Sequence, residues 1–372
     1  MLNVRYPYSA HEQKDYENER YRFIELMEGS VARVYTDSYG IPTVGIGHAF
    51  SENITKNKVD KLLRKAFSNP SFTLTDTQWT LLSETISLGY AARSAQGAAT
   101  DAAVNAKNTT DPVKKAEYQA ESTKQYNKYI EKRDAAWAKI LPAANSELHG
   151  TYISSRDNMS ISFSSTAMKY IFDEDILEFE GGIIPMNLPN SKERISILSL
   201  RFNGIAMPTT EGYINGSSSA SQRVAIWYEI RYRSNKNKNG KVHRRRIDES
   251  DEFGLFTSAD GLTPESDNEA KQVVRYLYSK RNTIEKDYIN KLKYTTNSSV
   301  PRYDMTYLDS VIEPTVTHLT SKYVDKINID GLDTQISTGI TIDGDIRIGG
   351  GIGTEVEDHE FFGNFSEIHP CA

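Results

Sequence analysis

Cysteine is almost absent from this chain. Its 372 residues contain one cysteine, Cys371, next to the C-terminal residue. An internal disulfide is therefore excluded, and so is a metal site built from several cysteines. The seven histidines are scattered and include no His-x-x-x-His pair, the usual sign of a helical zinc site. We expect no metal, no cofactor and synthesis in a reducing cytosol.

Long apolar runs are also missing. No stretch of 18 apolar residues occurs, so the sequence predicts no membrane insertion. Residues 1–20 are polar and charged and lack the apolar core of a secretory signal peptide. We therefore expect the protein to be made in the cytoplasm without such a peptide.

An excess of positive charge is lacking as well. The chain has 44 Lys and Arg against 50 Asp and Glu, a net charge of −6, which predicts no general binding of nucleic acid. Residues 231–246 are a local exception, with eight basic residues and no acid. This run is either a solvated loop or a contact with an anionic polymer, and charge runs are usually solvated.

What is present is a globular composition, 38% hydrophobic and 25% charged, over a length that suggests two or three structural units. Helical periodicity dominates. Tyr16–Met27 is expected to be an amphipathic helix with Phe23, Leu26 and Met27 at helical spacing. Further helices are expected over residues 55–67, 164–179, 195–204, 221–232 and 264–293.

Residues 91–136 differ in composition, because they are rich in Ala, Lys, Gln, Asn and Glu and poor in large apolar residues. Within them, Thr110-Asp111-Pro112 combines a capping side chain with a proline that fits the first helical turn. Another helix is expected to begin near Thr75 and Asp76. The pattern predicts two long helices that form a projecting hairpin over residues 76–141.

Strand signals occur at two places. Ala32–Tyr35 and Thr43–Ile46 are expected to be short strands, joined by a turn that begins with Asp37 and ends with Gly40. Between Ile327 and Ile352, isoleucines recur at alternate positions, interrupted by Asp-Gly dipeptides at 330–331 and 343–344. This second pattern predicts a C-terminal β appendage of about three or four short strands, which we expect to serve packing or partner contact.

Three side chains near the N-terminus suit the hydrolysis of a glycosidic bond. That reaction needs one carboxylic acid to protonate the leaving oxygen and a second group on the other face of the sugar. Glu28, at a helix end, would be the acid, and partial burial would favour its protonated form. Asp37 would stay ionised, and Thr43, whose hydroxyl donates and accepts, would hold a water molecule together with Asp37.

The residues around these three carry a more specific signal. The chain reads Glu28-Gly29, then Val34 to Asp37, then Gly40, then Thr43-Val44-Gly45-Ile46-Gly47-His48, with intervals of nine and six between the three side chains. This resembles the N-terminal lobe of phage-type lysozymes, glycoside hydrolase family 24. In that family a Glu-Gly pair, a strand ending Tyr-x-Asp, a glycine turn and Thr-x-Gly-x-Gly-His follow one another. Residues 166–180, 197–204 and 227–249 resemble later elements of the family.

The resemblance implies an α+β, lysozyme-like two-lobe fold, mostly helical, with a helical-hairpin insertion and the β appendage. The implied segments are a catalytic helix and hairpin lobe (1–50), the insertion (51–154), a helical lobe (155–295) and the C-terminal extension (296–372). The implied reaction is inverting hydrolysis of the β-1,4 bond between N-acetylmuramic acid and N-acetylglucosamine. It requires the carboxyl groups of Glu28 and Asp37 to lie about 6.5–9.5 Å apart.

The expected catalytic set is Glu28, Asp37 and Thr43, and the residues expected to bind the glycan are Tyr35, Gly47, Arg245 and Arg246. Several alternatives stay open. Tyr35 either lines the sugar cleft or packs. The arginines from Arg244 to Arg246 either orient Glu28 or touch the glycan, and at least one should pair with Glu249 or Asp248.

Other residues are expected to be structural. His48 should form hydrogen bonds, and Phe202, Trp227 and Tyr228 should belong to the core. Gly45 and Gly47 do not predict a dinucleotide site, because position 50 is a phenylalanine instead of a third glycine.

The chain is larger than the compact lysozymes, with about a hundred residues between His48 and Met168 and about 110 after Phe256. In this it resembles lysozyme domains of secreted antibacterial effectors, such as pesticin-like bacteriocins and type VI secretion cargo. That resemblance implies action in the periplasm or on the cell wall of target bacteria. The implied partners are peptidoglycan glycan strands, a secretion-apparatus protein and an immunity protein. The alternative is a non-hydrolytic peptidoglycan-binding or structural module that retains a lysozyme body.

Overall fold

The computed structural model describes residues 2, 4–142, 159–183, 188–205, 210, 212, 214, 220–234, 243–289, 305–322, 333–336 and 340–343. Several predicted features lie outside these residues. They are Cys371, residues 235–242 of the basic run, and the strands expected around Ile327 and Ile346.

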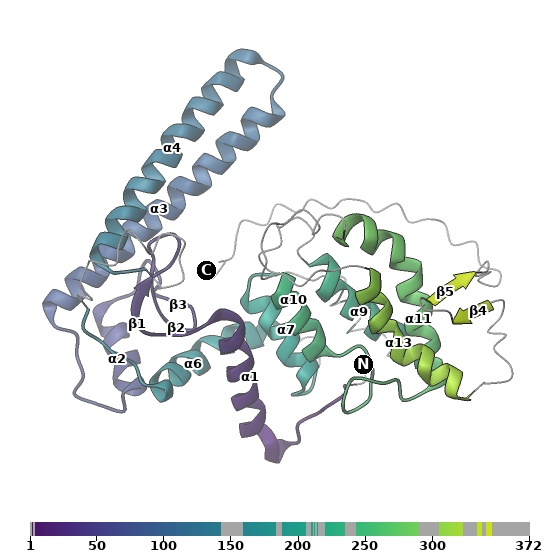
Figure 1. Cartoon of the computed structure of the whole chain (residues 1–372). Helices are drawn as coiled ribbons and strands as arrows, with labels where there is room; N and C mark the ends of the chain where they lie inside the picture. Colours follow the sequence, from purple (N-terminus) through teal and green to yellow (C-terminus); the bar gives the residue numbers. More distant parts are fainter. Residues whose placement is uncertain are drawn as a thin grey trace. The chain divides into compact units, whose positions relative to one another are not determined.

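The described chain is mostly helical and contains a small antiparallel sheet, so the predicted α+β class is confirmed (Figure 1). The helices are α1 (Gln13–Glu28), α2 (Lys56–Ala66), α3 (Asp76–Asn108), α4 (Pro112–Lys139), α6 (Ser165–Ile183), α7 (Lys192–Phe202), α9 (Ala220–Tyr228), α10 (His243–Phe253), α11 (Asp267–Thr283) and α13 (Met305–Lys322). A 3-10 turn, η1 (Ala10–Glu12), precedes α1, and π-helical turns η3 (Glu229–Arg233) and η4 (Ile284–Ile289) follow α9 and α11. The strands are β1 (Val31–Thr36), β2 (Pro42–Gly45), β3 (His48–Ala49), β4 (Asp333–Ile336) and β5 (Ile340–Asp343).

The chain divides into two compact units. One is formed by Arg20–Glu178 and is called the hairpin unit below. The other is formed by Met1–Glu19 and Phe179–His369 and is called the helical unit. The division of the sequence into the four segments implied by the family resemblance stays a prediction.

The sheet of the hairpin unit has the order β1-β2-β3 and is antiparallel. Tyr35 on β1 pairs with Thr43 on β2, and Thr43 also pairs with Ala49 on β3. The first two strands lie where the sequence predicts them, and their observed ends differ from the predicted ends by about one residue. The third strand was not expected, because two residues are too few to show an alternating pattern.

The core of the hairpin unit lies between this sheet and the helices α2, α3 and α6. Its buried side chains include Val34, Val44, Phe50, Val59, Leu63, Leu82, Ile86, Met168 and Ile171. Burial of such aliphatic and aromatic side chains provides the main favourable term for folding of the unit.

The long helices α3 and α4 form the predicted helical hairpin. The side chain of Thr75 caps α3 by accepting from the backbone of Gln78, and Asp111 caps α4 just before Pro112. The buried face of α3 is a row of alanines, Ala92, Ala95, Ala99, Ala102 and Ala106. Since alanine has only a methyl group, α4 packs closely beside α3, as Figure 1 shows.

Helix α1 is present as predicted, but one position of its expected apolar face is wrong, because Phe23 and Met27 are half-buried while Leu26 is exposed. Leu26 is 76% exposed, whereas Arg20, Tyr21 and Ile24 are buried. The reason lies in α6, where Asp173 accepts an ion pair from Arg20 at 3.1 Å. A buried arginine with such a partner occupies a position that apolar spacing alone would not select.

The helical unit is built around α7. Its apolar residues from Ile195 to Phe202 are buried as predicted, and Gly204, with φ +70°, follows the helix end. Trp227 and Tyr228 also belong to the core, as expected. Near the C-terminal end of the described chain, β4 and β5 pair antiparallel, which confirms part of the predicted β appendage. Among the described helices, none is both long and apolar enough to cross a lipid bilayer.

Candidate active site

Glu28 is the last residue of α1. Gly29 follows with φ +74°, and its amide donates to the carbonyl of Glu25 at 2.8 Å, the usual way in which a left-handed glycine ends a helix. The side chain of Glu28 is half-buried, and its Oε1 atom is shielded from solvent. The side chain thus lies at the C-terminal end of a helix, which carries partial negative charge.

Asp37 begins the turn between β1 and β2. Its Oδ1 accepts from the backbone amides of Tyr39 at 2.9 Å and Ile41 at 2.7 Å, so the side chain is fixed by its own turn. Burial raises the pKa of Asp37 to about 6, although the backbone amides and the charge of Arg93 act in the opposite direction. This carboxyl therefore binds a proton more tightly than an exposed aspartate does.

Thr43 lies in the middle of the sheet and is only 2% exposed. Its hydroxyl donates to the carbonyl of Ile41 at 3.0 Å. Because the hydroxyl hydrogen is used in this way, Oγ1 offers its lone pairs to any further partner and acts as an acceptor.

The neighbouring predicted residues have varied surroundings. Tyr35 is 9% exposed and pairs with Thr43 across the sheet, which favours a packing role. Gly47 has φ +80° between β2 and β3. His48 lies with Nδ1 at 3.2 Å from Oδ1 of Asp175 on α6.

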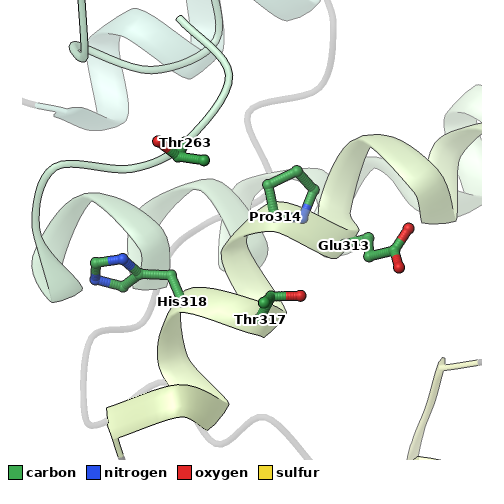
Figure 2. Close-up of a pocket in the computed structure, with 5 residues that line it drawn as sticks. All are labelled: Thr263, Glu313, Pro314, Thr317 and His318. Atoms are coloured by element: carbon green, nitrogen blue, oxygen red, sulfur yellow. The ribbon is translucent and has the colours of Figure 1, made fainter. Parts of the chain in front are cut away.

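The helical unit has a hollow of its own. The hollow has a volume of about 370 Å³. Figure 2 shows the residues that line it, namely Thr263, Glu313, Pro314, Thr317 and His318. The ring of His318 contacts Asp267 with a distance of 2.9 Å between Nε2 and Oδ1. The lining residues include one carboxylate, Glu313, so they do not supply the pair of groups that glycoside hydrolysis needs.

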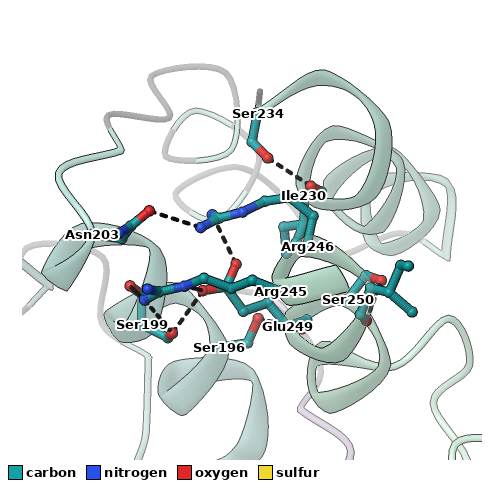
Figure 3. Close-up of polar contacts among 10 residues, drawn as sticks. Ser196, Ser199, Asn203, Ile230, Ser234, Arg245, Arg246, Glu249 and Ser250 are labelled. Carbon is teal, nitrogen blue, oxygen red and sulfur yellow. Dashed lines mark hydrogen bonds and ion pairs between the residues drawn. The ribbon is translucent and has the colours of Figure 1, made fainter. Parts of the chain in front are cut away.

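Arg245 and Arg246 also belong to the helical unit (Figure 3). Nε of Arg245 lies 2.9 Å from one oxygen of Glu249, and Nη1 of Arg246 lies 2.8 Å from the other. Arg246 also donates to Oδ1 of Asn203 at 3.0 Å. The prediction that at least one of these arginines pairs with Glu249 is confirmed.

Glu249 is fully buried, and serines of α7 complete its surroundings. Ser199 donates to its carboxylate at 2.7 Å, and Ser196 donates to its backbone carbonyl at 2.6 Å. Helices α7 and α10 are therefore joined by a buried polar network (Figure 3). Glu28, Asp37, Thr43, Tyr35 and Gly47 belong to the hairpin unit, whereas the two arginines do not; their role with Glu28 or the glycan stays a prediction.

Two contacts of the turn that begins at Asp37 were not predicted from the sequence. The indole nitrogen of Trp137 donates to the carbonyl of Asp37 at 3.0 Å, and the hydroxyl of Tyr129 donates to the carbonyl of Ser38 at 3.3 Å. A signal existed, since Tyr129 and Trp137 are large aromatic residues in a segment poor in apolar side chains.

Among the residues that the structure describes, no cluster of three or more His, Cys, Asp or Glu side chains could hold a metal ion. In comparisons with protein-family models, curated proteins and solved structures, no match to the chain was found.

Proposed function

We propose that this protein is a lysozyme-type glycoside hydrolase that cuts the β-1,4 bond between N-acetylmuramic acid and N-acetylglucosamine in peptidoglycan. One observation carries the proposal. Within one compact unit, a shielded carboxyl ends a helix, and an antiparallel hairpin that begins three residues later presents a carboxylate and a hydroxyl acceptor. These are Glu28, Asp37 and Thr43, in the spacing that resembles phage-type lysozymes.

Glu28 is proposed to act as the general acid. Its shielded Oε1 and its position at the negative end of α1 both favour the protonated carboxyl. It would give its proton to the glycosidic oxygen while the bond from that oxygen to the anomeric carbon breaks. Positive charge then develops at the anomeric carbon, as in other glycosidases.

Asp37 and Thr43 are proposed to direct the attacking water. Thr43 has an accepting oxygen because its hydrogen is used by Ile41. A water molecule that donates one hydrogen to Thr43 and the other to Asp37 turns a lone pair toward the anomeric carbon. Asp37 takes up the proton as the new carbon–oxygen bond forms, and the configuration at that carbon is inverted.

The first experiment replaces the acid. Glu28→Gln removes the transferable proton with little change in shape, so the rate of release of muropeptides from purified cell wall should fall at least ~100-fold. The matched control is Glu25→Gln, one turn earlier on α1, whose carboxylate accepts from the hydroxyl of Tyr21; it should keep the wild-type rate. Both variants should melt near the wild-type temperature.

Mass analysis of the products identifies the bond. The proposal expects fragments with N-acetylmuramic acid at the new reducing end, and proton NMR of fresh product should show the inverted anomer first. A Glu28→Gln variant that still clears cell walls would exclude the assigned acid. Binding to insoluble peptidoglycan without release of reducing ends would favour a non-hydrolytic wall-binding module instead.

The role of an antibacterial effector is part of the proposal. It is supported by segments additional to a compact lysozyme, above all the α3–α4 hairpin and the residues after Phe256. In this role the protein is made in the cytoplasm and acts in the periplasm or on the wall of a target bacterium. Its partners are then the glycan strands, a secretion-apparatus protein and a cognate immunity protein.

A further inference from the structure

The turn that carries Asp37 lies directly against the α3–α4 hairpin. A Cβ atom added to Gly89 of α3 would lie 2.6 Å from the carbonyl oxygen of Gly40 and 2.7 Å from the nitrogen of Ile41. A Cβ atom added to Gly40, which has φ +87°, would lie 2.6 Å from Cβ of Ala136 of α4. Both helices therefore touch the turn so closely that no methyl group fits between them.

Hydrogen bonds from α4 hold the backbone of the same turn. Trp137, which is 1% exposed, donates to the carbonyl of Asp37, and Tyr129 donates to the carbonyl of Ser38. The guanidinium group of Arg133 lies 4.3 Å from the centre of the Trp137 ring and so covers the indole. The indole is consequently fixed from both its edge and its face.

The strand that leads into the turn is tied to the end of α4 as well. The backbone amide of Thr36 donates to the carbonyl of Leu141 at 3.1 Å, and its hydroxyl donates to the carbonyl of Ile140 at 2.9 Å. On the far side of Asp37, Tyr39 and Ile41 are buried in one apolar cluster with residues of α3 and α4, namely Ala92, Ala95 and Tyr129.

With the proposed function as premise, we propose that the α3–α4 hairpin is a brace that holds Asp37 in its working position, with Gly89 and Trp137 as positioning residues. The side chain of Asp37 is fixed by amides of its own turn. A displacement of the turn therefore moves the carboxylate with it. Misplacement of a reacting group by about 1 Å can lower a rate ~100-fold.

The brace also determines the electrostatic surroundings of Asp37. On α3, Arg93 attracts the carboxylate, and Tyr90 lies close enough for Asp37 to affect its pKa. On α4, the nearby Arg133 is paired with Asp134 at 2.8 Å. Burial is the largest cause of the raised pKa of Asp37, so a loosened turn that admits water should lower that pKa toward its ordinary value.

Two glycines of α3 provide a matched test. Gly89→Ala and Gly97→Ala both exchange a helical glycine for alanine, which favours the helix. A Cβ at Gly97 meets nothing within 4 Å, whereas one at Gly89 meets the backbone of Gly40. Gly97→Ala should keep the wild-type kcat, while Gly89→Ala should lower kcat roughly tenfold or more with KM changed less than about twofold. A folded Gly89→Ala variant with wild-type kcat would overturn the proposal.

Trp137→Phe tests the brace without adding atoms. It keeps an aromatic ring and removes the hydrogen bond to the carbonyl of Asp37, and kcat should fall roughly tenfold. A structural role alone would leave the Asp37 site unchanged in the folded variant. The brace instead predicts faster amide hydrogen exchange at Tyr39 and Ile41, and a lower pKa of Asp37 by carboxyl NMR.

These NMR measurements separate the two proposals. If wild-type protein releases no muropeptides, the proposed function fails, but exchange rates and the Asp37 titration still test the brace. Unchanged exchange and an unchanged Asp37 pKa in both folded variants would overturn it. If Gly89→Ala does not fold, the measurements on Trp137→Phe alone decide whether the hairpin is a brace.

Discussion

Asp37 is the residue whose surroundings say most about chemistry. Burial raises its pKa to about 6, while an unfolded chain would show the ordinary value near 3.8. The native state therefore holds this proton more tightly than the unfolded state. The contribution of Asp37 to stability is largest below about pH 4 and is lost as the pH rises through about 6. A buried ionised carboxylate at neutral pH thus costs stability, a cost that is common at functional sites.

The same shift predicts a pH dependence of the reaction. In the proposed mechanism Asp37 is ionised when it accepts the proton of the attacking water, so kcat/KM should fall about tenfold per pH unit below about pH 6. Initial rates on purified cell wall between pH 4 and pH 8 would show this limb, and carboxyl NMR would assign it to Asp37. A limb whose midpoint differs from the Asp37 titration measured by carboxyl NMR would contradict the role given to Asp37.

At the scale of elements, the joint between α7 and α10 invites a stability test. Glu249→Ala would remove a fully buried carboxylate and leave Arg245 and Arg246 without their shared partner. Loss of one member of a buried ionic network costs about 3–5 kcal/mol, which urea unfolding would measure.

The control for this test is an exposed ion pair on α4. Glu121 lies 3.4 Å from Lys124, one turn apart on the helix surface, and Glu121→Ala should leave the unfolding midpoint near that of the wild type. If the two substitutions lowered the free energy of unfolding equally, the buried network would contribute no more to stability than the exposed ion pair.

Elements with local signals could be predicted from the sequence. Thr75 and Asp111 mark the starts of α3 and α4 because a capping side chain acts within three residues. The turn from Asp37 to Gly40 follows from the residues that favour its backbone conformation. The burial of Arg20 on α1 could not be predicted, because it depends on Asp173, a partner 153 residues away.

At the scale of the whole molecule, the sequence predicts the residues of the site that lie close together along the chain and misses those that lie far apart. Glu28, Asp37 and Thr43 lie within sixteen residues, so helix-end and turn signals order them along the chain. Trp137 stands 100 residues from Asp37, and Gly89 acts through the absence of a side chain. Sequence patterns of one chain do not encode such contacts, and only the packed structure reveals them.

The proposed effector role gives a prediction for the whole protein. Fused to a leader that directs it to the periplasm of a Gram-negative host, the chain should lyse the cells, since the proposed substrate lies there. Production in the cytoplasm should be tolerated, and Glu28→Gln should be harmless in both compartments. Equal toxicity in both would argue against the cell wall as the target. Relief by a co-expressed neighbouring reading frame would identify an immunity protein, and its absence for every neighbour would count against one.

The length of the helical hairpin has one more consequence. At 1.5 Å per residue, the 20 residues from Gly89 to Asn108 extend about 30 Å away from the Asp37 turn. The connection from Thr109 to Asp111 is thus remote from the proposed chemistry, and a fluorophore attached there would leave the reacting groups untouched. A partner bound at this far end, however, could displace the turn that carries Asp37, the proposed base, through the length of the two helices.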